Sequence, residues 1–342
     1  MTGCIRCFLL GSRRVSLFKN VGEFNRLMAL VCGGLFVVVI CLLPAVRLMI
    51  SIQRVLDQLD IIAIVVLVAL ILRRRGQLKR LYDLTELFLW VFVFMCIIHP
   101  LVQVAARTPV PLADVYLARI DRILGIETPQ VVHWISSLPL LNKVLAFSYN
   151  VLGFLVLAAV TIPVLTRKSN IGQRFVVSGA MAASTSVAIS AVCPAVGPWV
   201  VYGYEPSPIQ AHTQEVLTAL KTSIGTVHDL GDYSALVSFP SFHTALAILC
   251  VIALWRWRLV RIPALLFGLL VCISTVTTGW HYVIDVIGGA LVALIAYAVG
   301  SWALRSSLKI QPWNASPSVD LVDDAASVRS HPATLLSDSH RG

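Results

Sequence analysis

The chain has 342 residues, of which 58% are hydrophobic and only 13% are charged. A soluble domain carries about a quarter of its residues as charged ones, so this composition excludes a soluble globular protein and indicates an integral membrane protein. The net charge of +10 is the charge expected of loops that face anionic lipid, and we therefore expect no binding to nucleic acid.

Apolar stretches long enough to cross a bilayer, which takes about twenty residues, follow one another along the chain. They predict an all-α polytopic membrane protein with about eight transmembrane helices, over residues 27–46, 57–72, 87–106, 144–166, 175–202, 236–255, 262–279 and 282–304. Between the third and fourth of these, residues 107–143 predict amphipathic helical pieces at the interface, with Trp134 as an anchor.

The basic residues are divided unevenly between the two sides that this pattern defines. Of the 27 Lys and Arg residues, 20 fall on the side of the termini and 7 on the other side. Because cytoplasmic loops carry the excess of positive charge, we expect cytoplasmic termini in a protein of the plasma (inner) membrane. The seven on the extracytoplasmic side are Arg47, Arg54, Arg107, Arg119, Arg122, Lys143 and Lys221.

Two motifs with ionisable side chains stand out in the apolar sequence. The first is P-S-F-H, which contains Ser241 and His243, and the second is G-W-H-Y-V-I-D, which contains His281 and Asp285. Ionisable residues inside a membrane are costly and therefore indicate a functional site. Counted at about 1.5 Å per helical residue, both histidines fall in the extracytoplasmic leaflet, so we expect them to converge there.

These residue types suit phosphoryl transfer through a phospho-histidine. A neutral imidazole, His281, can attack phosphorus and divide one difficult step into two, while Asp285, four residues on, holds its other N–H. His243 can protonate the departing oxygen, and Ser241, at the start of a helix, can bind phosphate. This chemistry requires no metal and no other cofactor.

Each residue also has a purely structural interpretation. Pro240 could simply begin a helix, Asp285 could only cap the eighth span, and His99, beside Pro100, is interpreted as a packing residue. The coincidence of both motifs on one side and at one depth favours the functional interpretation.

At these residues the chain resembles the type 2 phosphatidic acid phosphatase superfamily. P-S-F-H and H-Y-V-I-D, in this order, look like its second and third motifs. The resemblance implies a helical membrane core with His281 as nucleophile, Asp285 as the residue that orients it, and His243 as the acid.

Three departures are similar to one branch of that family, which contains the inositol phosphorylceramide synthases. Thr275 stands where the third motif usually has arginine, Phe242 replaces the usual glycine, and the chain contains no Arg-Pro pair. D-R-I-L-G-I-E and C-P-A-V-G-P-W also look like upstream elements of that branch. The basic residues that could replace the lost phosphate ligands are Arg107, Arg119, Arg122, Lys143 and Lys221.

The sequence therefore predicts a phosphotransferase or phosphatase acting on lipid phosphate esters. The main interpretation is an enzyme that moves a phosphorylated head group, with phosphoinositol as a candidate, from a phospholipid to a lipid hydroxyl. The first alternative is a lipid or polyprenyl phosphate phosphatase, and the second is a transporter or an inactive scaffold. The partners expected are the lipid substrate and the bilayer.

We expect four segments along the chain. They are a basic cytoplasmic N-terminus (1–26), N-terminal transmembrane helices (27–106), a catalytic membrane core (107–304) and a disordered cytoplasmic tail (305–342).

Overall fold

The computed structural model describes residues 22–74, 78–223, 228–229 and 236–307. The segments predicted as a basic N-terminus and as a disordered tail therefore lie almost entirely outside the described residues.

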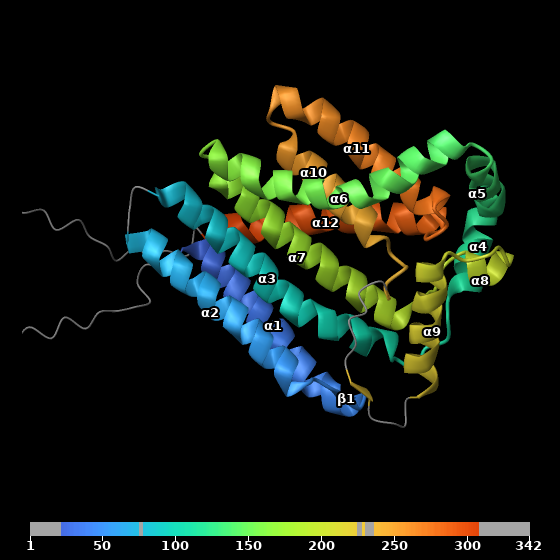
Figure 1. Ribbon diagram of the computed structural model, residues 1–342, viewed down its shortest axis with the longest axis horizontal. Coiled ribbons are helices and arrows are strands. Elements are labelled where there is room, and N and C mark those ends of the chain that lie inside the picture. Colours follow the sequence, from blue (N-terminus) through green and yellow to red (C-terminus); the bar gives the residue numbers. More distant parts are fainter. Residues whose placement is uncertain (1–21, 75–77, 224–227, 230–235, 308–342) are drawn as a thin grey trace, which may run out of the picture.

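Helices dominate the described part of the chain, with one pair of two-residue strands (Figure 1). In chain order the elements are α1 (Glu23–Ala45), β1 (Leu48–Met49), α2 (Ile52–Arg74), α3 (Lys79–Ala106), α4 (Asp114–Ile123), α5 (Thr128–Ser136), α6 (Pro139–Leu165), α7 (Ser169–Val192), α8 (Trp199–Tyr202), α9 (Pro208–Thr222), β2 (His228–Asp229), α10 (Phe242–Leu254), α11 (Arg258–Thr277) and α12 (Val283–Ser307). The strands pair in parallel, with Leu48 opposite His228.

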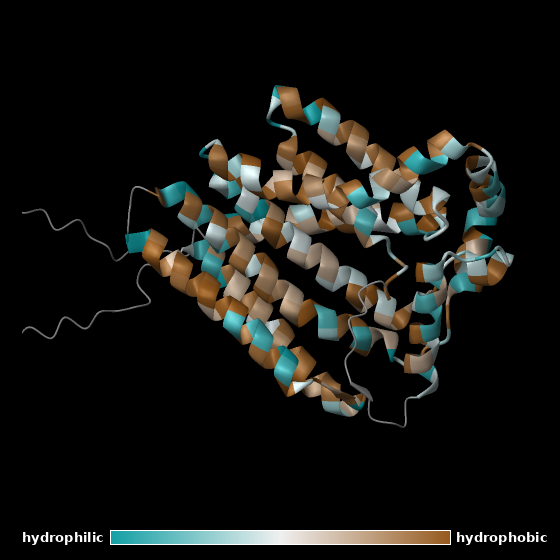
Figure 2. Cartoon of the chain, viewed as in Figure 1, coloured by the Kyte–Doolittle hydropathy of each residue, from teal (hydrophilic) through white to brown (hydrophobic). Residues whose placement is uncertain are grey.

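Seven of the described helices are long and apolar enough to cross a membrane, namely α1, α2, α3, α6, α7, α11 and α12. Hydrophobic residues cover most of their length (Figure 2). The remaining predicted span, the sixth (236–255), corresponds to α10, whose 13 residues reach about 20 Å. The predicted all-α polytopic membrane fold is thus confirmed, with one span that is shorter than a bilayer is thick.

One predicted span was too long. The stretch 175–202 was expected to form a single helix, but α7 ends at Val192 and α8 is a separate four-residue helix. Between them Pro194 and Pro198 supply no backbone N–H, and the N–H groups of Val196 and Gly197 are bound by a buried carboxylate described below. Helix α7 ends here because that carboxylate, and not a carbonyl group of the helix, accepts the hydrogen bonds of these two N–H groups.

Helix α7 lies at the centre of the bundle and packs against α3, α6, α10 and α12. Small residues allow the closest approaches, as is common between membrane helices. A Cβ atom added to Gly289 of α12 would lie 2.3 Å from the carbonyl oxygen of Ser241, and one on Gly288 would lie 3.1 Å from Pro240. The start of α10 therefore rests directly on the backbone of α12.

The short helices α4, α5, α8 and α9 gather at one end of the long helices (Figure 1). The link between α11 and α12 lies at this end. Gln210 of α9 donates a hydrogen bond to the link, and Asp121 of α4 accepts one from the N–H of Val283, where α12 begins. Helices α4 and α5 occupy the region that the sequence predicted as amphipathic, and Trp134 is exposed. This end of the bundle carries both sequence motifs.

Candidate active site

His281 and Asp285 meet at the short link between α11 and α12. The Nδ1 atom of His281 lies 3.2 Å from Oδ2 of Asp285, and both side chains are buried. Asp285 stands in the first turn of α12 and its carboxylate turns back over the link. The backbone N–H of His281 donates to the carbonyl of Thr275 at 3.1 Å, which fixes the histidine to the end of α11.

One carboxylate oxygen of Asp285, Oδ2, receives all of the hydrogen bonds described for that carboxylate. Besides His281, the backbone N–H of Tyr282 donates to Oδ2 at 3.0 Å and the hydroxyl of Ser238 donates to it at 3.4 Å. A carboxylate bound in this way holds the Nδ1–H tautomer of the imidazole. Burial lowers the pKa of His281 to about 4, against a smaller opposite effect of the Ser238 backbone, so the imidazole is neutral at neutral pH.

His243 lies in the first turn of α10, opposite His281. The centroids of the two imidazole rings are 6.3 Å apart. Tyr149 of α6 stacks on His243 with a centroid distance of 4.4 Å, and its hydroxyl lies 3.5 Å from Nδ1. Tyr149 was not predicted from the sequence, because an aromatic residue within a span carries no signal of its own.

Ser241 lies in the same turn but does not line the cavity described below. Its Oγ atom accepts hydrogen bonds from the N–H and the hydroxyl of Thr244, at 3.4 and 3.2 Å, and so caps α10. Its own N–H donates to the carbonyl of Asp285 at 3.0 Å. The phosphate-binding role expected of Ser241 stays a prediction, and the structure gives it a capping role in addition.

Both histidines line a cavity of about 640 Å³ between α3, α6, α7 and α10. Most of its wall is apolar, and the described residues that line it include no Lys, Arg, Asp or Glu. The apolar residues include Met95, Ile98, Val102, Leu152, Val187, Phe242 and Leu246. The polar ones are His99, Tyr149, Asn150, Ser186, Ser238, His243, Thr278 and His281.

Two further buried carboxylates hold the link in place. Asp121 of α4 accepts hydrogen bonds from the N–H groups of Val283 and Ile284, at 2.8 and 2.9 Å, and thereby caps α12. Asp114 accepts the hydroxyl of Tyr282 at 3.2 Å, as well as the two N–H groups of the α7–α8 connection. Burial raises the pKa of Asp114, and these hydrogen bonds oppose that increase.

These contacts explain the two upstream sequence elements. D-R-I-L-G-I-E begins with the residue that caps α12, and C-P-A-V-G-P-W contains the N–H groups that bind Asp114. The sequence indicated both elements only through the family resemblance. It could not show that they meet at the same link.

Helix α9 and the residues before it complete the support of the link. The hydroxyl of Tyr204 donates to the carbonyl of Gly279 at 3.0 Å, and Nε2 of Gln210 donates to that of Thr278 at 3.2 Å. Gly279 has φ +77°, and a Cβ atom there would lie 2.8 Å from the Tyr204 hydroxyl. A glycine is required here for both reasons.

The five basic residues proposed as substitute phosphate ligands do not line the cavity. The buried guanidinium of Arg107 donates to the carbonyl groups of Arg47 and Ser223, and Lys221 donates to those of Thr108 and Val110. Both cations therefore connect the residues that follow α3 with other segments of the chain, and Lys221 does so from α9. The other three, Arg119, Arg122 and Lys143, are exposed.

Thr275, at the position where the family has arginine, also lies outside the cavity wall. It is fully buried, its hydroxyl donates to the carbonyl of Cys272 at 2.7 Å, and its own carbonyl binds the N–H of His281. It thus contributes to the position of His281 through its backbone.

Residues 115–299, which make up more than half of the chain, match the PAP2 superfamily. The chain therefore belongs to this superfamily, and the resemblance seen in the two motifs is confirmed at that level. Over 120 residues the chain is 38% identical to undecaprenyl-diphosphatase BcrC of Bacillus subtilis (strain 168). This segment covers 35% of the chain and 51% of the relative, so the match spans about half the length of that protein. No solved structure matches the chain.

The cap that Asp121 provides to α12 leads to a first prediction. Asp121→Ala removes the acceptor for two N–H groups and for the hydroxyl of Thr128, and we expect it to lower the free energy of unfolding by about 1–3 kcal/mol. The melting temperature of the purified protein in detergent measures this loss. Glu127→Ala, at an exposed carboxylate six residues further on, is the control and should leave the melting temperature unchanged. Equal melting temperatures for both variants would contradict the capping role.

Proposed function

We propose that this protein is a lipid phosphate phosphatase that works through a phospho-histidine. The observation that carries the proposal is the pair formed by His281 and Asp285, which faces His243 across a ring distance of 6.3 Å in an apolar cavity. The name of the Bacillus relative supports hydrolysis more than the head-group transfer predicted from the sequence, and it makes a polyprenyl diphosphate the first substrate to assay.

In the proposed reaction, Nε2 of His281 attacks phosphorus as the bond from phosphorus to the leaving oxygen breaks. His243 gives a proton to that oxygen, and the negative charge of the substrate favours the protonated ring that this step requires. Water then attacks the phospho-histidine, loses a proton to His243, and releases inorganic phosphate with His281 restored. Asp285 stabilises the imidazole while it carries positive charge.

The walls of the cavity support a lipid as substrate. Met95 of α3, with 47% of its surface exposed, and the exposed Asn150 of α6 belong both to the cavity wall and to the outer surface of the bundle. A substrate that enters between α3 and α6 could keep its hydrocarbon chain in the bilayer. Because α3 contributes to the wall, we propose that the catalytic unit comprises α3 together with the core predicted over residues 107–304.

Head-group transfer is the second candidate, as in the inositol phosphorylceramide synthase-like branch. The absence of Lys and Arg from the described cavity wall favours it, since a phosphodiester head group carries less charge than a terminal phosphate. A lipid alcohol could reach the phospho-enzyme along the same route as the substrate.

A side-by-side assay separates the two candidates. We expect the purified protein to release inorganic phosphate from farnesyl diphosphate without any added acceptor, because water can reach the phospho-enzyme. Phosphatidylinositol supplied with a ceramide should give no product. Phosphate release that stays at the level of a His281→Ala control, together with transfer of phosphoinositol to ceramide, would reverse the ranking.

The proposed roles of the two histidines predict different defects. His281→Ala should abolish turnover and prevent formation of an acid-labile phospho-enzyme, because no nucleophile remains. His243→Ala should slow turnover by about 10²- to 10⁴-fold, the usual contribution of a general acid, while phospho-enzyme still forms. Rapid-quench labelling with a ³²P-labelled lipid measures both. His212→Ala, at an exposed histidine of α9, is the control, and phospho-enzyme in His281→Ala would refute the mechanism.

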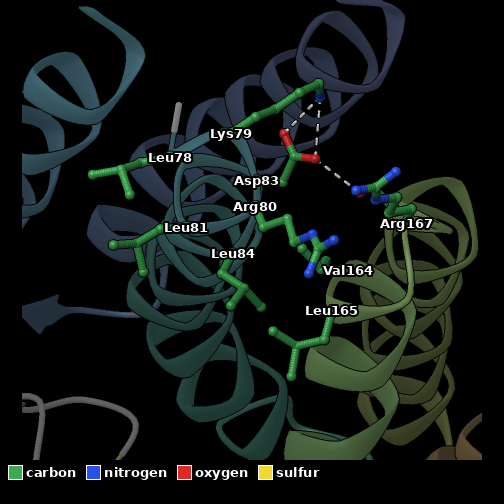
Figure 3. Close-up of a pocket in the computed structure, with 10 residues that line it drawn as sticks. Leu78, Lys79, Arg80, Leu81, Asp83, Leu84, Val164, Leu165 and Arg167 are labelled. Atoms are coloured by element: carbon green, nitrogen blue, oxygen red, sulfur yellow. Dashed lines mark hydrogen bonds and ion pairs between the residues drawn. The ribbon is translucent and has the colours of Figure 1, made fainter. Parts of the chain in front are cut away.

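We further propose that the active site faces the extracytoplasmic side of the plasma membrane and that the termini lie in the cytoplasm. The end of the bundle opposite the site is rich in positive charge. There Lys79, Arg80 and Arg167 stand around a surface cleft of about 760 Å³ (Figure 3). Such an excess of basic residues is typical of the cytoplasmic side.

Labelling of single cysteines tests this orientation. In a variant that lacks the eight native cysteines, Ser137→Cys at the end of α5 should react with a membrane-impermeant maleimide added to intact cells. Lys168→Cys, in the connection between α6 and α7, should react only after the cells are opened. Both positions are exposed, so accessibility within the protein is matched. The opposite pattern would place the active site in the cytoplasm.

A further inference from the structure

The wall of the catalytic cavity contains two buried polar atoms without a described partner. They are Oγ of Ser186, on α7, and Nε2 of His99, on α3. Ser186 is 1% exposed. His99 also borders a smaller cavity of about 260 Å³ between α1, α2 and α3, so it stands in the wall between the two cavities.

The hydroxyl of Ser186, a serine in a membrane helix, makes no described hydrogen bond within its own helix. Such hydroxyl groups commonly donate to the carbonyl one turn earlier, as Ser184 does to Ala180 at 2.8 Å and Ser148 does to Val144 at 2.7 Å. Ser186 does not make this bond. A buried polar group left without a partner costs about 1–3 kcal/mol, and alanine in its place would avoid that cost. A ligand in the cavity would supply the missing partner.

Both side chains lie at about the depth of His243. Ser186 is six residues before the end of α7 and His99 is seven before the end of α3, so each lies about 10 Å below that end of the bundle. The contact of Gly289 with Ser241, six residues into α12, places the start of α10 at the same depth. The two polar groups are thus level with His243.

We propose that Ser186 and His99 bind the second, non-reacting phosphate of a lipid diphosphate. This proposal rests on the proposed function and names its substrate class. A hydroxyl and an imidazole N–H can both donate to phosphate oxygens, and the described wall contains no carboxylate to repel them. These neutral donors take the place of basic residues, which the described part of the cavity wall does not contain.

The position also suits the proposed reaction. When Nε2 of His281 attacks the terminal phosphorus, the bond to the bridging oxygen breaks, and the lipid monophosphate leaves with a proton from His243. Its charge remains on the phosphate next to the lipid. Ser186 and His99 would stabilise that charge as the bond breaks, and a lipid monophosphate substrate would gain nothing from them.

Binding to an inert protein tests the proposal without turnover. In the His281→Ala background, isothermal titration compares the dissociation constants of farnesyl diphosphate and farnesyl monophosphate. Ser186→Ala should weaken binding of the diphosphate by about tenfold or more, the value of a hydrogen bond to a charged group, and should change monophosphate binding by less than twofold. Ser186→Thr, which keeps the hydroxyl, should preserve the preference, and His99→Ala should reduce it.

Ser178→Ala is the matched control. Ser178 lies on the same helix, is fully buried and also has a hydroxyl without a described partner, but it does not line the cavity. It should leave both dissociation constants unchanged. Equal losses for the two ligands in Ser186→Ala, or no loss for either, would overturn the subsite.

The two proposals can fail separately. If the wild-type protein releases phosphate from neither ligand, the proposed phosphatase function is wrong. The preference for diphosphate in the inert background still decides whether Ser186 and His99 form the subsite.

Discussion

The candidate active site depends on one constraint, which is that the buried polar backbone of the link between α11 and α12 has to be hydrogen-bonded. An unsatisfied backbone group in an apolar medium is costly. Two buried carboxylates meet this need, since Asp285 binds the N–H of Tyr282 and Asp121 binds the first N–H groups of α12. A third, Asp114, binds the hydroxyl of Tyr282. The same hydrogen bonds that make the link stable also orient His281.

This arrangement explains why so much of the structure surrounds two short motifs. Helices α4 and α9 and the α7–α8 connection lie far apart in the sequence, yet each supplies a hydrogen bond to the link or to its partners. Helix α10 is short because it begins at the site and not at the membrane surface. Its first turn rests on Gly289, and the ring of His243 lies 6.3 Å from that of His281.

The cavity is lined by polar and by apolar residues, and the two kinds suit the two parts of a lipid phosphate. Several helices and the α11–α12 link contribute the imidazole and hydroxyl groups, and residues such as Leu152 and Leu246 are apolar. Because the described wall contains no Lys, Arg, Asp or Glu, the interactions proposed with phosphate depend on hydroxyl and imidazole donors. In an environment of low dielectric constant, such donors are stronger than they are in water.

The sequence by itself determined the membrane class, the approximate spans and the two motifs, because hydrophobic length and the cost of ionisable residues in lipid are properties of local sequence. It also predicted the approach of Asp285 to His281, which are four residues apart. Only the tertiary structure decided that α7 ends at Val192, that Arg107 and Lys221 bind backbone carbonyls, and that Tyr149 stacks on His243. Each of these depends on a partner from a distant helix, and the local sequence carries no record of which helices pack together.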